Sequence, residues 1–515
     1  MKMMEDPALY DVAIVGFGPV GAVAAGLLGA RGLRTYVCDK QRDVYDKPRA
    51  ISLDHEIIRL FQQMGVAEAI QPFIEPFTDS VFYGVDGQII KRMSTVAPPY
   101  PLAHTPSVVF TQPPTEQVLR AHAQSFPSVQ LDLGKTLKHF TQDGDCVRLL
   151  LEDDEGGHKS VRARYLLGCD GASSKVRALA EIALEDLDFD EAWLVVDVLV
   201  NDKGKAKLPR TSVQYCKPER PSTYLICPGN HRRWEIAINP GEDPQQVATV
   251  EGVWRLLSPW ITADDATLWR QASYRFHALV AKEWRKGRVL IAGDAAHQQP
   301  PFLGQGMCQG LRDVANLSWK LQAVLQAGAP ERLLDTYGAE RHAHVIDLTT
   351  RIKGIGQIVG ERNLERARQR DARLLAECAG VVRPTPRQDV QPALRAGLLA
   401  SQAHSARGTI FPQPWLKPAH RVPKRMDDLL GYGWRLVLAA DAEAALVELS
   451  GQISLPGLRV VQLGVNGFEE QDGVLAAWFA RHACQAALVR PDHYVYGLID
   501  SASQLQEQLG ALSQF

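Results

Sequence analysis

Three glycines near the start of the chain have the spacing of a phosphate-binding turn. They form the pattern G-x-G-x-x-G between a short apolar run, residues 12–15, and a helix expected over residues 19–30. The first glycine of such a turn allows a tight bend, the second lets a pyrophosphate approach the backbone, and the third lets the helix pack against the strand. The helix N-terminus adds free N–H groups and a dipole that favours phosphate. The residues predicted to bind a dinucleotide here are Gly16, Gly18, Pro19, Val20 and Gly21.

A carboxylate follows this turn at the distance that suits a ribose. Residues 35–38 form a second apolar run, which Asp39 ends and Lys40 follows. An acid about 20 residues beyond the turn hydrogen-bonds ribose hydroxyls in dinucleotide-binding units, so both residues are assigned to the cofactor site. Arg49, in the next loop, is either a ligand of a second phosphate or a solvated loop arginine. An ordinary glycine-rich turn without a ligand is the alternative interpretation of the whole stretch.

A second glycine-rich loop follows an apolar strand in the middle of the chain. The strand ends at Gly293 and Asp294, and a proline-rich loop then leads to a helix that Gly306 opens. The dipole of this helix favours negative charge at its start, and the Asp294 carboxylate can accept hydrogen bonds from a polyol. Asp313, inside the helix, is expected to matter much less for the cofactor. The residues assigned to the cofactor site are Gly293, Asp294, Pro301, Gly304, Gly306 and Met307.

Two polar residues near these loops have both a functional and a structural interpretation. His297 is a candidate base, although a histidine that holds the proline-rich loop in place is the favoured interpretation. Asp170 and Gly171 follow an apolar strand over residues 161–167. In a doubly wound sheet Asp170 lies near the first glycine turn, and the alternative is a plain strand-to-helix corner with an N-cap.

Composition excludes several classes of protein. The chain has 515 residues, of which 45% are hydrophobic and 23% charged, and its formal net charge is −2. This charge gives no overall electrostatic case for binding nucleic acid or an anionic membrane. The eight cysteines form no C-x-x-C pair, which argues against a zinc site or a dithiol and fits reduced cytosolic thiols. The acidic start and the lack of a long apolar run predict neither signal peptide nor membrane span, so the cytoplasm is the expected compartment.

The intervening pattern mixes helices and strands. Residues 54–64 predict an amphipathic helix, residues 81–90 a hairpin, and residues 116–124 a helix with Thr115 as its N-cap. Residues 193–239 change to short strands separated by turn residues. This predicts a separate antiparallel sheet that can form one wall of a substrate pocket.

The C-terminal third begins with a charged helical stretch. Residues 351–399 predict a solvated or dimer-facing arm, so a homodimer is a candidate assembly, and residues 384–392 and 411–423 read as linkers. Residues 427–515 alternate strand and helix, as in a small α/β domain.

Together, the three motifs resemble those of the FAD-dependent aromatic hydroxylases, single-component flavoprotein monooxygenases built like p-hydroxybenzoate hydroxylase. The resemblance covers about residues 11–350. It implies that the first turn binds the FAD pyrophosphate, tightly and without a covalent bond, and that Asp294 binds the ribitol chain. It also implies that Asp170 and Gly171 form a motif linked to FAD and NAD(P)H binding. Further positions where the family contacts FAD are Arg49 and Gln112.

The closer resemblance is to the 3-(3-hydroxyphenyl)propionate hydroxylases. Asp39 departs from the wider family, which more often has a glutamate at this position. Members of this group often carry a C-terminal thioredoxin-like domain without redox cysteines, and Cys484 is the only cysteine of the corresponding tail. The segments that carry the resemblance are residues 48–65, 191–198, 293–321 and 488–497.

The resemblance and the residue patterns together predict an α/β protein. A Rossmann-like FAD-binding domain of the glutathione-reductase type carries an inserted antiparallel β substrate domain and a C-terminal thioredoxin-like domain. The first part of the FAD-binding domain is expected over residues 1–190, with a substrate-side hairpin near 80–110, and its second part over residues 276–350. The substrate domain is expected between them, over residues 191–275. The arm and linker are expected over residues 351–410, and the last domain over residues 411–515.

The implied reaction is the ortho-hydroxylation of a phenolic acid. NADH or NADPH reduces FAD, O₂ adds to give a flavin C4a-hydroperoxide, and one oxygen passes to a carbon beside the phenol hydroxyl. The implied substrates are 3-(3-hydroxyphenyl)propionate and 3-hydroxycinnamate, which give 2,3-dihydroxyphenyl products. No metal is expected. The candidates for assisting phenol deprotonation are Asp54, His55, Tyr215 and Tyr224.

Several other functions share parts of this pattern. A monooxygenase of another phenol or of a polycyclic aromatic has the same motifs. A flavin halogenase needs a W-x-W-x-I-P motif and a disulfide reductase needs a dithiol and a second glycine turn, and the chain contains neither. A non-catalytic FAD-fold binding protein is expected to have decayed motifs around the flavin ring, whereas residues 293–310 are intact.

Overall fold

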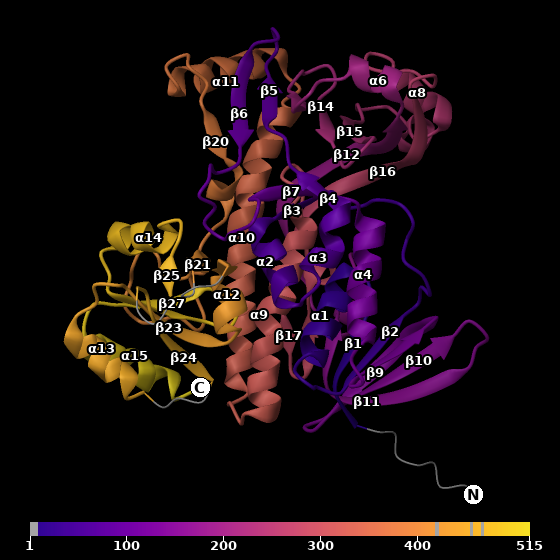
Figure 1. Cartoon of the computed structure of the whole chain (residues 1–515). Coiled ribbons are helices and arrows are strands. Elements are labelled where there is room, and N and C mark those ends of the chain that lie inside the picture. Colours follow the sequence, from indigo (N-terminus) through magenta and orange to yellow (C-terminus); the bar gives the residue numbers. More distant parts are fainter. Residues whose placement is uncertain (1–8, 418–421, 454–456, 465–467) are drawn as a thin grey trace, which may run out of the picture.

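The computed structural model describes residues 9–417, 422–453, 457–464 and 468–515. Figure 1 shows three bodies: a lower one that contains the N-terminal strand β1, an upper one built around β12 and β16, and a C-terminal one at the side. The helix α10 (Arg332–Gly360) runs from the lower body to the upper one.

The lower body is a doubly wound sheet. Its strand order is β17-β18-β11-β1-β2-β8, and the neighbours from β18 to β8 pair in parallel. β10 adds an antiparallel extension between β11 and β9. The apolar run of β1 is buried, as expected for a parallel strand covered on both faces. The strands are β1 (Leu9–Val15), β2 (Thr35–Asp39), β8 (Val129–Leu133), β9 (Lys135–Gln142), β10 (Val147–Asp153), β11 (His158–Gly168), β17 (Arg285–Lys286) and β18 (Val289–Ile291).

Helices cover this sheet and mostly begin where the sequence predicts. The exception is α4, for which Thr111, not Thr115, is the N-cap. Thr115 lies inside the helix and its hydroxyl donates to the Thr111 carbonyl. The two prolines at residues 113 and 114 are tolerated because the first helical turn needs no N–H donors. The helices are α1 (Pro19–Gly29), α2 (His55–Gln63), α3 (Ala67–Ile70), α4 (Gln112–Gln124), α5 (Lys175–Leu179) and α9 (Gly306–Gln326).

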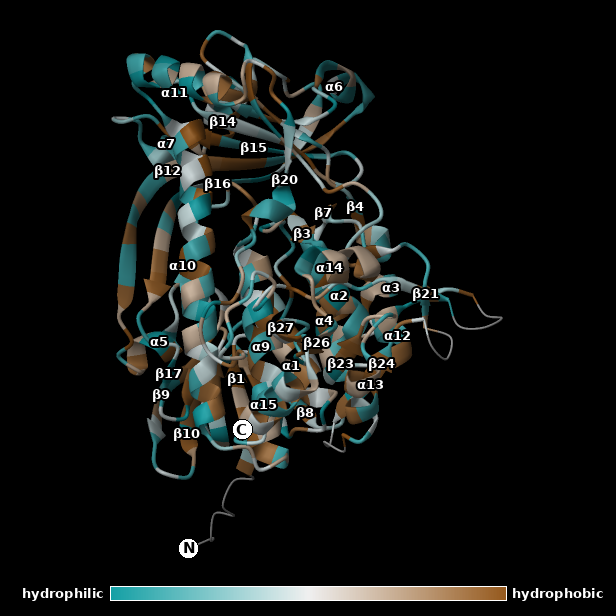
Figure 2. Cartoon of the chain, turned by 90° about the vertical axis from the view of Figure 1, so that its left-hand side faces the viewer, coloured by the Kyte–Doolittle hydropathy of each residue, from teal (hydrophilic) through white to brown (hydrophobic). Residues whose placement is uncertain are grey.

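The upper body is the predicted β-rich insertion, although it recruits strands from outside residues 191–275. Its order is β19-β16-β12-β15-β14-β13-β5-β6-β20. β12 and β16 are 17 and 16 residues long, and Figure 2 shows them curving down beside α10 toward the lower body. The strands are β5 (Ser80–Tyr83), β6 (Ile89–Ser94), β12 (Leu184–Val200), β13 (Ser212–Tyr215), β14 (Ser222–Ile226), β15 (His231–Ala237), β16 (Ala266–Ala281), β19 (His297–Gln298) and β20 (Pro384–Pro386).

Smaller elements complete the upper body and its junction with the lower one. The order of the junction sheet is β3-β7-β4. The remaining elements are β3 (Ser52–Asp54), β4 (Ile74–Pro76), β7 (Ser107–Phe110), α6 (Asp202–Lys207), α7 (Pro244–Val247), α8 (Val250–Leu257) and the short 3-10 helices η1 (Gln71–Phe73), η2 (Gly293–Ala295) and η3 (Arg387–Val390).

The predicted helical arm is integrated into the fold rather than detached from it. α10 continues across residue 350, and Leu348 and Ile352 are buried in a core shared with the upper sheet. α11 (Leu364–Glu377) is more exposed, but its Asp371 carboxylate accepts the Val85 N–H of the hairpin between β5 and β6. Part of the expected linker, β20, pairs in parallel with β6. These contacts tie the arm to the substrate-side sheet.

The C-terminal body has a mixed sheet in the order β24-β23-β26-β27. β23 pairs in parallel with β24 and antiparallel with β26. The expected linker over residues 411–423 contains β21, while its residues 418–421 lie outside the described residues. The elements are β21 (Trp415–Lys417), β22 (Lys424–Arg425), α12 (Met426–Leu430), β23 (Trp434–Leu438), α13 (Ala444–Gly451), β24 (Leu458–Gln462), β25 (Glu469–Glu470), α14 (Val474–His482), β26 (Ala486–Val489), β27 (Val495–Ile499) and α15 (Ala502–Leu512).

Buried ion pairs join this C-terminal body to the rest of the chain. Arg59 of α2 pairs with Asp427 of α12 at 2.7 Å, and both side chains are fully buried. Arg490, which follows β26, pairs with Glu340 of α10 at 2.7 Å, also without exposure. Guanidinium groups buried in this way depend on their carboxylate partners, so the C-terminal body is a fixed part of the molecule.

Candidate cofactor and substrate site

The three sequence motifs meet at the carboxyl ends of neighbouring parallel strands. The glycine turn follows β1, Asp170 follows β11, and Gly293 follows β18, and these strands lie side by side in the order β18-β11-β1. The carboxyl edge of an open α/β sheet, at the point where the strand order reverses, is where such folds bind ligands. The sequence therefore placed these motifs correctly relative to one another.

The glycines of the first turn are required by close contacts. A Cβ on Gly16 would lie 2.4 Å from the Cys169 carbonyl oxygen, and the φ of Gly16 is +101°. A Cβ on Gly21 would lie 1.9 Å from the Gly16 carbonyl oxygen. Around Gly18, in contrast, no atom lies within 4 Å of a Cβ position. The first and third glycines thus pack the turn, and the second leaves a backbone surface that a pyrophosphate can approach.

The start of α1 is open and its flanking acid is in place. Gly18 is the N-cap of α1 and no side chain caps the helix. Asp39, at the end of β2, accepts the Phe17 N–H at 2.6 Å and the Gln41 N–H at 2.7 Å. It therefore stabilises the turn and stays beside it. Lys40 is exposed next to Asp39.

Asp170 links the second motif to the third. Its carboxylate accepts the N–H groups of Lys175 and Val176 at the start of α5, at 2.7 and 3.0 Å. Arg177 of the same helix donates to the Ala295 carbonyl at 2.8 Å. The Asp170 corner is therefore a helix-capping corner, and it also positions the loop that contains Asp294.

Asp313 is the residue that sequence reasoning undervalued. Its carboxylate accepts the Gly293 N–H at 2.9 Å and His297 Nε2–H at 2.8 Å, while Arg341 Nε–H donates to its other oxygen at 2.8 Å. Burial opposes ionisation of Asp313, but the His297 and Arg341 partners outweigh it and hold its pKa below the usual value. Asp313 fixes the turn that presents Asp294, and His297 has the structural role that the sequence favours.

Asp294 itself is exposed and directly follows Gly293. Desolvation by the surrounding protein raises the pKa of the Asp294 carboxyl, although the residue is still exposed to solvent. Gly293 has a φ of +62°, and a Cβ there would lie 3.0 Å from Val20 of α1. The second loop thus packs directly against the first turn.

Arg49 and Gln112, both assigned to the cofactor site, are joined by a hydrogen bond. Gln112 Oε1 accepts the backbone N–H groups of Arg49 at 3.2 Å and Ala50 at 2.7 Å. Arg233 of β15 donates to the Arg49 carbonyl at 2.7 Å. The Arg49 side chain is half exposed and lies 3.9 Å from Glu116. This loop is therefore held between the lower body and the upper sheet.

A cavity of about 150 Å³ lies where these two bodies meet. One wall comes from the loop after β2 and from the proline-rich loop before α9. The other comes from alternate residues of β13, β14 and β15, with Phe77 and Arg387 beside them. The lining residues used below are Arg49, Ser80, Gln214, Thr223, Arg233, Glu235, Gln299, Pro301, Leu303, Gly304, Gly306, Met307 and Arg387.

The two tyrosines predicted as catalytic candidates do not line this cavity. Tyr224 lies in the core of the upper sheet against Trp234, with ring centroids 5.0 Å apart, and its hydroxyl donates to the Pro209 carbonyl at 3.4 Å. Tyr215 packs against Trp260 on the same side. Successive side chains of a strand face opposite sides, so the neighbours of these tyrosines line the cavity instead.

The polar residues on the cavity side were missed at the sequence level. They are Gln214, Thr223, Arg233 and Glu235. They lie at positions that alternate with core-facing residues such as Val213, Tyr224 and Trp234, and this alternation is the pattern that could have identified them. Thr223 donates to Gln214 at 2.6 Å, and Arg233 is paired with Asp197 at 2.7 Å. Of these four side chains, only the Glu235 carboxylate has neither a hydrogen bond nor an ion pair within the described residues.

Asp54 and His55 line a neighbouring cavity of about 260 Å³, not the first one. Asp54 caps α2 by accepting the Ile57 N–H at 3.2 Å, and it pairs with Arg312 at 2.5 Å. His55 is buried, and burial lowers its pKa to about 4. Leu303 and Arg387 line both cavities, so the second cavity lies beside the first.

Charge and hydrogen bonding show that the first cavity suits a polar ligand. The Ser80 hydroxyl and the Gln299 amide are buried there without a hydrogen-bond partner. Buried polar groups are almost always paired, so a ligand with hydroxyl or amide-like groups fits these atoms. Burial raises the pKa of Glu235 to about 7, while Arg233 opposes this rise.

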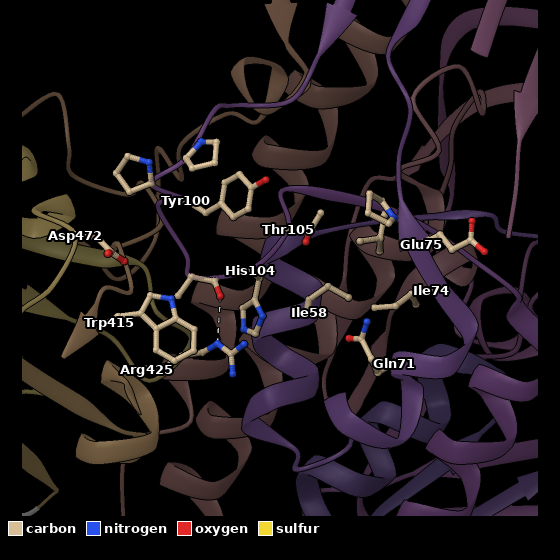
Figure 3. A pocket seen from close by; sticks show the side chains of 15 residues that line it. Ile58, Gln71, Ile74, Glu75, Tyr100, His104, Thr105, Trp415, Arg425 and Asp472 are labelled. Carbon is tan, nitrogen blue, oxygen red and sulfur yellow. Dashed lines mark hydrogen bonds between the residues drawn. The ribbon is translucent and has the colours of Figure 1, made fainter. Parts of the chain in front are cut away.

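A third hollow, of about 660 Å³, lies apart from the cofactor loops. Figure 3 shows it between the segment of Tyr100 and His104, the side chains of Trp415 and Arg425, and Glu75 on the far side. Arg425 stacks on Trp415 with its guanidinium carbon 4.7 Å from the ring centroid. This third hollow lies at the junction between the lower and C-terminal bodies.

The described residues contain neither a metal-binding cluster nor a helix that could span a membrane. They contain no group of three or more histidine, cysteine, aspartate or glutamate side chains arranged to hold a metal ion. Within the same residues, every helix is too short or too polar to traverse a lipid bilayer.

The fold and the glycine turn define a dinucleotide-binding α/β protein, and comparisons identify its family. Residues 9–352 match the model of the FAD binding domain, and residues 408–514 match that of the HcaD C-terminal domain. A probable NADH-specific resorcinol 4-hydroxylase of Rhodococcus jostii (strain RHA1) is 36% identical over 508 residues, covering 96% of this chain and 93% of that protein. A 3-(3-hydroxy-phenyl)propionate/3-hydroxycinnamic acid hydroxylase of Burkholderia cenocepacia (strain HI2424) is 30% identical, covering 96% and 94%.

Solved structures show the same fold. The flavin-dependent monooxygenase PieE, in complex with FAD and substrate, is 23% identical with a TM-score of 0.80 and covers 99% of this chain and 100% of its own. Aklavinone-11 hydroxylase, with FAD and aklavinone, has the same identity and TM-score and covers 99% of each chain. The chain belongs to the FAD-dependent aromatic hydroxylases and is a flavoprotein monooxygenase. The halogenase, disulfide reductase and non-catalytic interpretations are therefore set aside.

Proposed function

We propose that this enzyme uses NADH or NADPH and O₂ to hydroxylate a phenol at the carbon beside its hydroxyl group. The first candidate substrates are 3-(3-hydroxyphenyl)propionate and 3-hydroxycinnamate, with 2,3-dihydroxyphenyl products. The relatives that carry these names span almost the whole chain at about 30% identity. The observation that carries the proposal is the cavity of about 150 Å³ between the cofactor loops and the polar face of the upper sheet.

The cofactor loops fit FAD, and each part of it has a residue of suitable chemistry. The open backbone at Gly18 and the uncapped start of α1 suit the pyrophosphate, Asp39 suits the adenosine ribose, and Asp294 suits the ribitol. FAD supplies the redox chemistry and the activation of O₂. The complete proposed set is Gly16, Gly18, Pro19, Val20, Gly21, Asp39, Lys40, Arg49, Gln112, Asp170, Gly293, Asp294, Pro301, Gly304, Gly306 and Met307.

The residues of the chain position the substrate and exclude water. Leu303 and the proline-rich loop close one side of the cavity, and the upper sheet closes the other. The polar side chains of β13, β14 and β15 then orient a phenol by hydrogen bonds. The N-terminus of α9, which begins at Gly306, stabilises negative charge beside it. The protein thus contributes the positioning of the substrate and the electrostatic stabilisation.

Resorcinol is the second candidate substrate. The relative that carries this name is 36% identical, against 30% for the first-named phenylpropionate hydroxylase. Resorcinol is smaller and has a second hydroxyl in place of the acidic side chain. The same relative's name also makes NADH the first choice of reductant. Polycyclic aromatics are the remaining alternative.

A substrate panel tests the proposal. The purified holoenzyme is given 3-(3-hydroxyphenyl)propionate, 3-hydroxycinnamate, resorcinol or a polycyclic phenol with NADH or NADPH, and both reductant oxidation and products are measured. The expected result is oxidation stimulated by a phenylpropanoid acid, with formation of its catechol. Hydroxylation of resorcinol alone would replace the first candidate by the second. Absence of a hydroxylated product from every phenol would refute the proposed function.

Three further features belong to the same proposal. Residues 411–515 form a thioredoxin-like unit that has a packing role, since Cys484 lacks a partner cysteine. The enzyme works in the cytoplasm, where its free cysteines and its reductant are stable. It forms a homodimer, for which the exposed face of α11 is the candidate contact. Sedimentation of the purified protein measures this last feature directly.

A further inference from the structure

Two charged side chains of the substrate cavity lack a partner of opposite charge. Glu235 of β15 and Arg387 of η3 both line the cavity of about 150 Å³. Within the described residues, neither forms an ion pair at 4.0 Å or less, with the other or with a third group. Charged groups inside proteins are normally paired. Two unpaired charges that face one cavity therefore point to a ligand with complementary groups.

Glu235 is the better buried of the two. Its exposed fraction is 4%, and it lies opposite Thr223 of β14 and Val195 of β12, neither of which is charged. The charged groups near it are Arg233 on its own strand and Asp197 on β12, which pair with each other at 2.7 Å. Because Asp197 already neutralises Arg233, the Glu235 carboxylate retains the ability to accept a proton or a hydrogen bond from a ligand.

Arg387 is held in place by neutral groups. Its Nη2–H donates to the Leu303 carbonyl at 2.9 Å, and its guanidinium carbon lies 4.2 Å from the centroid of the Phe77 ring. Burial lowers its pKa to about 10, so it remains a cation at neutral pH. It also lines the second cavity. A substituent on the side of the first cavity that faces the second would therefore lie near this cation.

We propose that Glu235 accepts the proton of the substrate's phenol hydroxyl and that Arg387 binds a carboxylate on the substrate's side chain. The inference rests on the proposed function and assigns its substrate class: phenols with a short anionic side chain rather than neutral phenols. Arg387 is then a specificity-determining residue, and Glu235 is the catalytic base that sequence reasoning did not find. Arg49, which also lines the cavity, is the only other cation there besides the paired Arg233 among the described lining residues.

The proton and electron balance is complete. Oxygen transfer makes the ring electron-poor and the phenol more acidic, so the phenol O–H bond breaks and the proton passes to the Glu235 carboxylate. The electron pair left on the phenol oxygen supports the new carbon–oxygen bond at the adjacent carbon. The O–O bond breaks as the new carbon–oxygen bond forms. That carbon then loses its own hydrogen as a proton, the proton held by Glu235 returns to the original phenol oxygen, and the ring regains aromaticity as a catechol. One oxygen atom of O₂ enters the product and the other leaves as water, with NAD(P)H as the two-electron donor.

The first test compares Arg387→Gln with the control Arg383→Gln, an exposed arginine nearby. Binding is measured as the change in flavin absorbance when the holoenzyme is titrated with 3-(3-hydroxyphenyl)propionate or its neutral amide. Loss of a hydrogen bond to a charged group is expected to weaken acid binding roughly 10- to 100-fold. Amide binding is expected to change less than about 3-fold. Equal weakening of both ligands, or no weakening of the acid, would overturn the Arg387 assignment.

The second test compares Glu235→Gln with Glu219→Gln, an exposed glutamate of the same domain. Wild-type kcat is expected to fall as pH drops below about 7, because protonated Glu235 cannot accept the phenol proton. Glu235→Gln is expected to lower kcat at pH 8 by roughly 100-fold or more, and to recover as pH approaches the phenol pKa. The wild type should also bind substrate more weakly below pH 7, and Glu235→Gln should lose this dependence. An unchanged pH profile in the variant would overturn the Glu235 assignment.

Failure of this inference is distinguishable from failure of the proposed function. Flavin content and melting temperature first establish that each variant is folded. If the wild type hydroxylates only neutral phenols, the carboxylate assignment of Arg387 is wrong while the hydroxylase remains. If folded wild-type holoenzyme hydroxylates no phenol, the proposed function is wrong, and the binding titrations still decide whether the acid contacts Arg387.

Discussion

Replacing Asp427 by asparagine should destabilise the junction between the C-terminal body and the flavin domain. The Asp427 carboxylate is fully buried and accepts Arg59 Nε–H at 2.7 Å and Nη2–H at 3.1 Å. Arg435, also fully buried, donates to the same carboxylate. The asparagine side chain would keep the shape but leave two buried guanidinium groups without a counter-charge. Breaking a buried ion pair by removing one partner costs about 3–5 kcal/mol, and we expect a loss of that size.

The pH dependence of this effect follows from the same contacts. Burial disfavours the charged form of Asp427, but the two arginines outweigh it and hold its pKa far below the usual value. The stabilisation is therefore fully present above the unfolded pKa of about 3.9 and is lost as pH falls toward the folded pKa. Between about pH 5 and pH 8, the difference in unfolding free energy between wild type and variant should stay constant.

Urea unfolding monitored by tryptophan fluorescence, together with flavin release, measures the loss. Asp428→Asn is the matched control, because the Asp428 carboxylate faces solvent and accepts Gln62 Nε2–H at 2.7 Å. This control substitution should change the free energy of unfolding by less than about 0.5 kcal/mol. If Asp427→Asn were no less stable than Asp428→Asn, the argument that this ion cluster fixes the C-terminal body would be refuted.

Three further predictions concern single residues. Gly21→Ala should abolish FAD retention, since the alanine Cβ would lie 1.9 Å from the Gly16 carbonyl oxygen. Flavin absorbance after gel filtration measures the retained FAD, and a variant that stays yellow would contradict the prediction. Asp313→Ala should weaken FAD binding at least about as much as Asp294→Ala, because a buried acceptor of charged donors typically contributes about 1.5–3 kcal/mol. The control in the same FAD titration is Asp335→Ala, because the Asp335 side chain is 68% exposed. Cys484→Ser should leave kcat within about twofold, because burial raises the thiol pKa to about 12 and keeps it protonated and unreactive at neutral pH; loss of activity in a folded variant would reveal a thiol function.

Local sequence patterns predicted much of the cofactor side. The glycine turn, the strands around it and the loops at Asp170 and Asp294 were identified because each motif follows a strand, and parallel strands bring their carboxyl ends to one edge. Their mutual contacts, such as the Asp313 carboxylate with the Gly293 N–H, were not identified. A buried acid within a helix looks like any helical acid until the partner strand is placed.

The substrate side was harder to predict because strand alternation does not reveal which face is functional. Tyr215 and Tyr224 have side chains of suitable chemistry, yet they lie on the core face, and Glu235 faces the cavity. Shifting a strand by one residue moves every one of its side chains to the opposite face of the sheet. Arg387 was missed for another reason: a segment that reads as a linker places it in the cavity through the pairing of β20 with β6, which no local pattern encodes.

This chain is a flavoprotein monooxygenase, and we propose that it inserts one oxygen atom of O₂ beside the hydroxyl group of a phenol. The most direct test is to supply the holoenzyme with NADH, 3-(3-hydroxyphenyl)propionate and isotopically labelled O₂, and to analyse the product by mass spectrometry. We expect a 2,3-dihydroxyphenyl product with one labelled oxygen atom, formed in proportion to the NADH consumed. NADH oxidation without labelled product from this acid or from any other phenol would contradict it.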